Sequence, residues 1–101
     1  MSNLENGTYN IEKLEHMSEV LKAVAHPLRI AIVDLLILHK ELTVTEIHSK
    51  LNIPQPEASR QLRTLKTGHL IKLRKEGNTR FYSLVDPSIS KLLHCVENCT
   101  I

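Results

Sequence analysis

The chain has 101 residues, of which 42% are hydrophobic, 24% charged and 3% aromatic, with two Cys and no Trp. This length fits one globular domain spanning residues 1–101, and so few aromatic side chains argue against a surface that stacks bases on rings. Two Cys cannot form a disulfide framework, and neither a membrane span nor a signal peptide is visible. We therefore expect a soluble, cytoplasmic protein with no membrane partner.

The positive charges are concentrated in one part of the chain. The net charge is only +2, yet residues 60–80 hold seven cations against the single anion Glu76, while the remaining residues hold six cations and ten anions. A basic block of this kind is typical of proteins that bind a phosphate backbone, but a solvated charged face would have the same composition. The seven cations are Arg60, Arg63, Lys66, Lys72, Arg74, Lys75 and Arg80.

The first two predicted helices follow a polar segment, residues 1–9, that we expect to be disordered. One helix begins at Ile11 and ends before Pro27, because a proline disfavours helical geometry in the residue before it. The second covers about residues 27–39 and is apolar nearly all round, which predicts a central position in the domain. The first helix has an apolar stripe with helical spacing, formed by Ile11, Leu14, Met17, Leu21 and Val24.

A helix-turn-helix is predicted over residues 43–67. Thr43 and Glu46 match a capping box that opens a short third helix, and residues 52–54 form a turn. Pro56 then opens a fourth helix that ends near Gly68. Two short helices joined by a tight turn are the arrangement found in many DNA-binding proteins.

The pattern changes from helix to strand after this segment. Residues 70–84 read as a β-hairpin, or wing, that turns at Gly77 and Asn78. Asp86 and Pro87 are suited to start a last helix over residues 86–99, with an apolar stripe formed by Ile89, Leu92, Leu93 and Val96. The predicted fold is thus mostly α with a small β-hairpin: a winged helix-turn-helix of four helices, a hairpin and a fifth helix.

The fourth helix carries the candidate base-reading residues. Arg60 lies nearly opposite its apolar stripe with Arg63 beside it, and Gln55 lies in the first turn, where a recognition helix touches bases. Gln and Arg side chains could pair with base edges in a major groove. Glu57 would repel phosphate unless it accepts from a cytosine or pairs with a neighbouring Arg. Taken singly, each residue could equally be an exposed polar side chain. The candidates are Gln55, Pro56, Glu57, Ser59, Arg60, Gln61, Arg63, Thr64 and Lys66 on the helix, and Arg74, Lys75, Asn78, Thr79 and Arg80 on the wing.

Four segments in the correct order resemble the ArsR/SmtB-type family of bacterial winged-helix regulators. They are residues 21–30 (LKAVAHPLRI), 42–47 (LTVTEI), 55–65 (QPEASRQLRTL) and 74–84 (RKEGNTRFYSL). The resemblance implies a homodimer formed by the first and last helices, which binds an inverted-repeat operator in double-stranded DNA as a repressor. Gln61 stands where the family commonly has His.

The metal sites of this family are incomplete here. Thr43 and Thr45 replace the Cys-x-Cys pair of the thiolate sensors, and Ser88 replaces a His expected two residues after Asp86, so we predict no cofactor and no established metal site. Cys95 and Cys99 are one helical turn apart, with His94 beside them. They could bind zinc or another thiophilic ion, or they could be small interface residues.

Other functional classes are less consistent with the sequence. We find no phosphate-binding loop and no nucleophile–base motif, so an enzyme is not expected. Two alternatives to a simple repressor remain: a repressor that switches through Cys95 and Cys99, and a winged-helix protein-interaction module that does not bind DNA.

Overall fold

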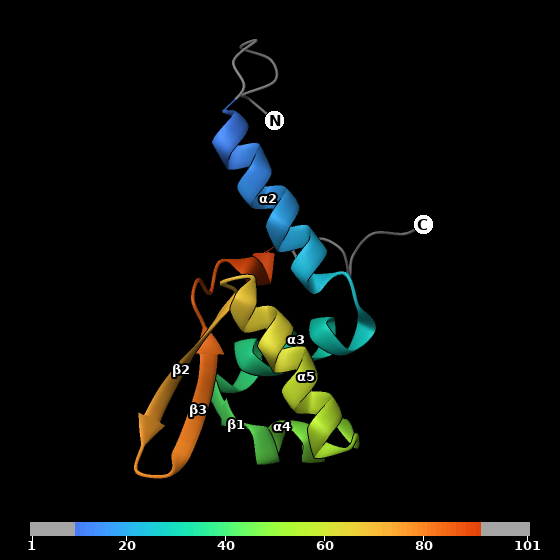
Figure 1. Cartoon of the computed structure of the whole chain (residues 1–101), viewed down its shortest axis with the longest axis vertical. Helices are drawn as coiled ribbons and strands as arrows, with labels where there is room; N and C mark the ends of the chain where they lie inside the picture. The colour runs from blue at the N-terminus through green and yellow to red at the C-terminus, as the bar shows by residue number, and fades with distance from the viewer. Residues whose placement is uncertain (1–9, 92–101) are drawn as a thin grey trace.

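The computed structural model describes residues 10–91 and confirms a mostly helical fold with a small antiparallel sheet. In chain order the elements are α2 (Ile11–Val24), α3 (Pro27–His39), β1 (Glu41–Thr43), α4 (Val44–Leu51), α5 (Gln55–Thr67), β2 (Ile71–Glu76) and β3 (Thr79–Leu84). Figure 1 shows α2 projecting from the body of the domain, with α5 crossing α3 and the β2–β3 hairpin extending to one side.

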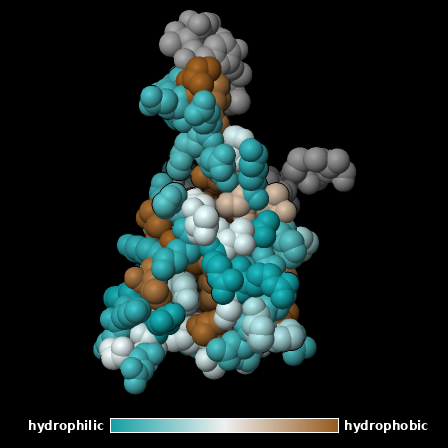
Figure 2. All heavy atoms as spheres, in the orientation of Figure 1, coloured by the Kyte–Doolittle hydropathy of each residue, from teal (hydrophilic) through white to brown (hydrophobic). Residues whose placement is uncertain are grey.

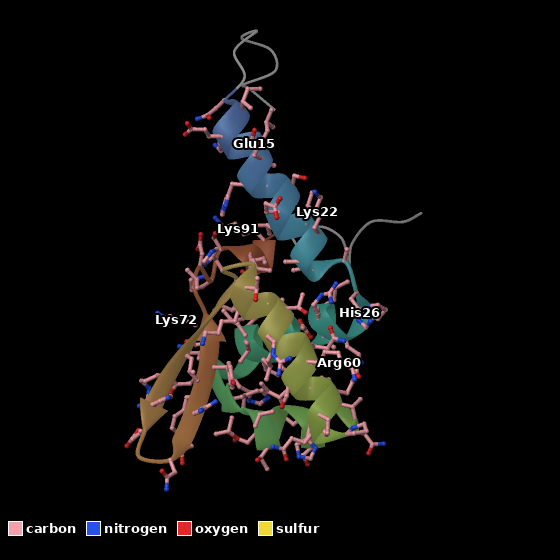
Figure 3. The ribbon with its side chains drawn as sticks, viewed as in Figure 1. Glu15, Lys22, His26, Arg60, Lys72 and Lys91 are labelled. Atoms are coloured by element: carbon pink, nitrogen blue, oxygen red, sulfur yellow. The ribbon has the colours of Figure 1, made fainter. Side chains whose placement is uncertain are left out.

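The boundary between α2 and α3 is determined by local chemistry. Ala25 ends α2, and His26 has extended backbone and accepts a hydrogen bond from the Leu28 amide through Nδ1 at 3.1 Å. Pro27 then occupies the first turn of α3, where its missing N–H costs nothing. Figure 3 shows His26 at this corner.

The core is formed by one face of α3 together with α5, α4 and the sheet. Ile32, Val33 and Leu36 of α3 are buried, but Ile30 and Leu38 of the same helix are exposed. The prediction that α3 is central is therefore correct for one face only. The remaining core is Ala23, Val24, Leu42, Ile47, Ala58, Leu62, Leu65, Leu70, Ile71 and Leu84.

The sheet contains a strand that sequence analysis did not predict. Lys40 takes a left-handed backbone conformation (φ 69°) and turns the chain from α3 into β1. β1 pairs antiparallel with β3, Glu41 opposite Ser83, and gives a sheet of order β1–β3–β2. This third strand attaches the wing to the helical body.

The end of α5 differs in detail from the prediction. Gly68 closes the helix with ordinary negative φ, and the left-handed residue is His69 (φ 61°). Gly68 is required for another reason: a Cβ added there would lie 2.9 Å from the Ala23 Cβ of α2. A side chain at Gly68 would therefore push α2 away from α5.

The predicted last helix lies mostly outside the described residues. The Asp86 carboxylate accepts a hydrogen bond from the Ser88 amide at 2.9 Å, which holds the pKa of that carboxyl below its ordinary value. Helical backbone follows over residues 89–91, where the described part ends. The predicted disordered segment, residues 1–9, is likewise outside it.

Candidate nucleic-acid interface

The helix-turn-helix has a hydrogen-bonded cap at its start and a left-handed residue at its turn. The Thr43 hydroxyl accepts from the Glu46 amide at 3.2 Å, and the Glu46 carboxylate accepts from the Thr43 amide at 3.0 Å, so the predicted capping box is present. These hydrogen bonds lower the pKa of Glu46. Asn52 then adopts left-handed geometry (φ 56°, ψ 47°) and ends α4, and α5 begins three residues later.

Helix α5 has a buried face and a polar face, as predicted. Ala58, Leu62 and Leu65 are buried against α3 and α4. Figure 3 shows Arg60 on α5. Most predicted DNA-contacting residues of this helix are exposed, namely Gln55, Pro56, Arg60, Arg63, Thr64 and Lys66, whereas Glu57 and Ser59 are half-buried.

Glu57 is paired with a neighbouring arginine, one of the two arrangements expected from the sequence. Its Oε2 lies 3.1 Å from Arg60 Nη1. The carboxylate is thereby neutralised where it would otherwise repel a phosphate. Thr64 is also engaged locally, since its hydroxyl lies 3.4 Å from the Arg60 carbonyl oxygen.

Gln61 occupies a different position from the one predicted. Only 5% of its surface is exposed, and it lies between α5 and α3. Its Oε1 accepts from Arg29 Nη1 at 3.0 Å, and its Nε2 donates to Glu57 Oε1 at 2.8 Å. A buried amide with both ends bonded cannot also reach a base edge, so Gln61 leaves the set of candidate base contacts.

The wing divides its charged side chains between two faces. Residues that alternate along each strand point to the same face, and Lys75 lies opposite Arg80 in the pairing of β2 with β3. Leu73 pairs with Tyr82 on the same face. Lys75 and Arg80 therefore place two positive charges directly opposite one another, an arrangement that is destabilising by itself.

Arg74 lies on the other face and is already paired. Its guanidinium donates to Glu41 at 2.8 and 3.1 Å and to Glu76 at 2.8 Å, and it lies 4.5 Å from the Phe81 ring centre. These hydrogen bonds raise the pKa of Arg74 and lower that of Glu41. All five predicted wing contacts are exposed, but Arg74 differs from the others because its charge is paired with Glu41 of β1 and with Glu76.

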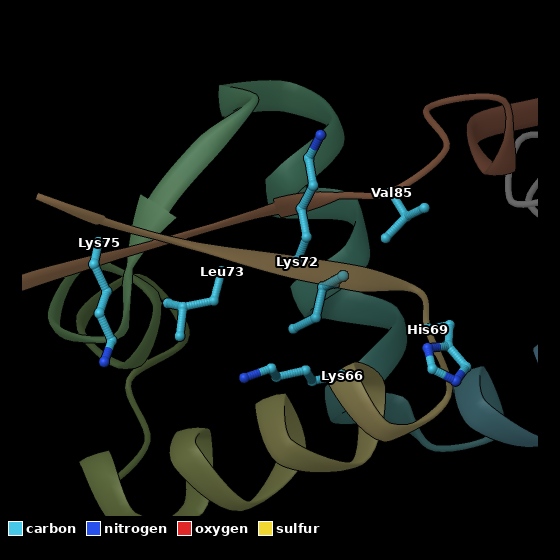
Figure 4. Close-up of a pocket in the computed structure, with 7 residues that line it drawn as sticks. Lys66, His69, Lys72, Leu73, Lys75 and Val85 are labelled. Atoms are coloured by element: carbon cyan, nitrogen blue, oxygen red, sulfur yellow. The ribbon is translucent and has the colours of Figure 1, made fainter.

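Two open hollows lie between α5 and the face of the wing that carries Lys75 and Arg80. One, of about 330 Å³, is lined by Ser59, Leu62, Arg63, Lys66, Leu73, Arg80 and Tyr82. Its neighbour, of about 530 Å³, is lined by Lys66, His69, Ile71, Lys72, Leu73, Lys75 and Val85 (Figure 4). We call these two hollows the α5–wing groove. Five of its lining residues are Lys or Arg and none is acidic, so its lining is positively charged.

Tyr82, Leu73 and His69 line the groove but were not among the residues predicted from the sequence. The alternation of β3 carried the necessary signal for Tyr82, because it shares a face with Arg80. The position of His69 depends on its left-handed backbone at the end of α5, which no local pattern indicated.

The other predicted sites are described only in part. Four of the five α2 stripe residues are exposed, with Ile11 at 60%, Leu14 at 42%, Met17 at 46% and Leu21 at 50%, whereas Val24 is buried in the core. Figure 2 shows apolar atoms on this projecting helix. Ile89 packs at the edge of the core. Leu92, Leu93, Val96 and the candidate sensor residues His94, Cys95 and Cys99 lie outside the described residues.

Residues 10–91 contain neither a membrane-spanning helix nor a metal-binding cluster. In that part of the chain no helix is both long and apolar enough to cross a bilayer. The same residues contain no group of three or more His, Cys, Asp or Glu side chains placed to bind a metal ion.

Comparisons with known proteins agree with this geometry. A family model described as a helix-turn-helix domain matches residues 24–74. An uncharacterized HTH-type transcriptional regulator of Methanocaldococcus jannaschii is 36% identical over 87 residues, which cover 86% of this chain and 98% of the relative. The transcriptional repressor PagR of Bacillus anthracis is 37% identical in an alignment 93 positions long that covers 84% of this chain and 93% of PagR.

Solved structures of related regulators have the same fold as this chain. The PagR crystal structure superposes with a TM-score of 0.79 at 32% identity over 86% of this chain and 99% of PagR. A homodimeric winged helix-turn-helix DNA-binding domain from Mycobacterium bovis, described as a possible ArsR-family transcriptional regulator, gives a TM-score of 0.73 at 30% identity and covers 86% and 80%. This chain therefore belongs to the helix-turn-helix domain family of transcriptional regulators, of the ArsR/SmtB type, and is a DNA-binding regulator rather than an enzyme.

Proposed function

We propose that this protein is a homodimeric repressor that binds an inverted-repeat operator in double-stranded DNA. The observation that carries the proposal is the cross-strand pair of Lys75 and Arg80, which faces Arg63 and Lys66 of α5 across the α5–wing groove. Four cations that converge with no carboxylate among the lining residues favour an anionic backbone as ligand.

The positions of the side chains separate residues suited to contact bases from residues suited to contact phosphates. Gln55, Arg60 and Arg63 are exposed on α5 and are suited to pair with base edges in a major groove. Ser59, Lys66, Lys75 and Arg80 line the groove, where they would contact phosphates. Asn78 and Thr79 at the wing tip would contact the backbone or an adjacent minor groove.

The exposed stripe on α2 supports a dimer. Four large apolar side chains on one face of a projecting helix would be covered by the same helix of a second copy and by the last helix. The homodimeric state of the M. bovis domain supports a dimer, and the name of PagR supports repression. A two-fold dimer would require half-sites about 34 Å apart, one turn of DNA. Because the partner is DNA, we place the protein in the cytoplasm.

The test is fluorescence anisotropy of the reduced, metal-free protein on DNA from upstream of its own gene. We expect binding that exceeds that of a scrambled duplex by at least about 1,000-fold and that weakens steeply between about 50 and 200 mM salt. Equal affinity for both duplexes at every salt concentration would contradict the proposal and favour the protein-interaction alternative.

The same titration tests regulation when repeated with Zn²⁺, arsenite and a persulfide donor. Release by one of these, lost in the Cys95→Ser variant, would assign the switch to the C-terminal thiols. Binding unchanged by all three would identify Cys95 and Cys99 as packing residues and leave the repressor controlled by a partner or by its own abundance.

A further inference from the structure

Four side chains form a continuous polar network from inside the domain to the exposed face of α5. Arg29 of α3 donates to Gln61, Gln61 donates to Glu57, and Glu57 pairs with Arg60, at 3.0, 2.8 and 3.1 Å. The inner end is buried: Gln61 is 5% exposed, and Arg29 Nε is buried without a hydrogen-bond partner in the described structure. The outer end is open, since 69% of the Arg60 side chain is exposed.

The network has only one consistent polarity. Arginine can only donate, so Arg29 requires the oxygen of the Gln61 amide. The amide NH₂ must then point at Glu57, which as a carboxylate can only accept. An amide flipped by 180° would place donor against donor and acceptor against acceptor, and both hydrogen bonds would be lost.

This polarity determines how α5 presents Arg60. One Glu57 oxygen is occupied by Gln61 and the other by Arg60, so the carboxylate is held along the helix and away from an approaching phosphate. Arg60 is anchored through one nitrogen and keeps its remaining N–H groups for a ligand. An arginine held in one pose loses less conformational entropy on binding than a free one.

We propose that Arg29 and Gln61 are positioning residues that determine base specificity without contacting DNA. They act through Glu57, which fixes Arg60 against its target base. This inference rests on the proposed function, because it assigns a role to residues behind the base-reading face of α5.

The test uses a duplex that the wild-type protein enriches from a randomised library, with a scrambled duplex of the same composition as reference. The quantity measured is the specificity ratio, the affinity for the enriched duplex divided by the affinity for the scrambled duplex. Gln61→Glu keeps an acceptor for Arg29 but replaces the donor to Glu57 by an oxygen, so the two carboxylates repel. We expect the ratio to fall about tenfold.

Two double variants separate positioning from a general loss of structure. Exchanging the pair, Glu57→Gln with Gln61→Glu, restores a complete network of donors and acceptors at unchanged net charge, and we expect it to recover most of the wild-type ratio. In an Arg60→Ala background, Gln61→Glu has no Arg60 to displace, so the ratio should not change further. Lys13→Gln is the control for loss of one positive charge, because Lys13 is exposed near the far end of α2.

A milder variant keeps the test decisive if Gln61→Glu does not fold. Arg29→Lys retains the charge but loses the planar guanidinium, and we expect the ratio to fall about threefold while thermal unfolding shows a folded protein. Unchanged ratios in the folded variants, or a Gln61→Glu effect that persists in full without Arg60, would overturn the inference. Failure of the wild-type protein to enrich any sequence would instead overturn the proposed function.

Discussion

Helices α5 and α2 are both exposed along one face, but their exposed faces have opposite chemistry. On α5 the apolar residues are buried and the outward face carries Arg60, Arg63 and Lys66. On α2 only Ala23 and Val24 are buried, and the outward face includes Leu14 and Leu21. The exposed α5 face is positively charged, whereas the α2 stripe is an apolar surface that we propose a second copy covers.

The difference also shows in how firmly each helix is held. Helix α5 is tied to α3 through Gln61 and to α4 through the core, whereas α2 projects from the body and contacts it near its C-terminal end (Figure 1). A base-reading helix must be rigid relative to its domain. A helix that dimerises, as we propose for α2, can acquire its remaining contacts from the partner.

The largest effect is expected from a charge in the α2 stripe. Leu14→Glu would place an unpaired carboxylate in the proposed interface, which costs several kcal/mol and should weaken dimerisation at least about 100-fold. Sedimentation equilibrium measures this. The matched control is His16→Glu, which adds the same residue about 160° away around the helix. Equal dimerisation constants for the two variants would show that the α2 stripe is not the interface.

The second effect tests the polar face of α5. Arg63→Ala should cost about 1–3 kcal/mol of operator binding and relax the base preference at one position. Anisotropy on an operator and its single-base variants measures both quantities. Lys22→Ala, a change of an exposed cation on α2, serves as control. If the Arg63→Ala protein binds all of these duplexes as the wild-type protein does, Arg63 does not read a base.

These two helices also show what local sequence can predict. The apolar spacing of α2, Pro27 at the start of α3 and the Thr43 capping box were sufficient for helix boundaries that the structure confirms. Each of these signals lies within a few residues along the chain. The turn at Gly77, with φ 62°, was visible for the same reason.

The features that were missed depend on residues far apart in the chain. β1 has only three residues, and its partners in β3 lie about forty positions away. The burial of Gln61 depends on its hydrogen bond with Arg29 from another helix, which no pattern within α5 indicated. The neutralisation of Arg74 likewise requires Glu41, which only the β1–β3 pairing brings close.

A smaller effect distinguishes the two faces of the wing. Lys75→Gln removes a cation from the α5–wing groove, so the slope of log affinity against log salt should decrease by about one, with similar loss for all sequences. Arg74→Gln is the matched comparison on the opposite face, where two carboxylates already pair with the charge. Its salt slope should stay closer to that of the wild-type protein. The reverse order would mean that DNA contacts the Arg74 face.

The smallest effect concerns acid stability at the junction of β1 and the wing. Hydrogen bonds from Arg74 hold the pKa of Glu41 below its ordinary value. A carboxyl whose pKa is lower in the folded state contributes stability above its unfolded pKa of about 4.3, and this contribution disappears as the pH falls through the folded pKa. Arg74→Gln should therefore return the Glu41 pKa towards its ordinary value and reduce the difference in folding stability between pH 7 and acid pH.

Two measurements test this prediction. Carboxyl ¹³C chemical shifts of Glu41 across a pH titration give its pKa, and urea unfolding at pH 7 and below pH 4 gives the difference in stability. Since the pair is solvent-exposed, the stability change should be small and should diminish with added salt. A Glu41 pKa that is the same in both proteins would mean that the Arg74–Glu41 contact does not persist in solution.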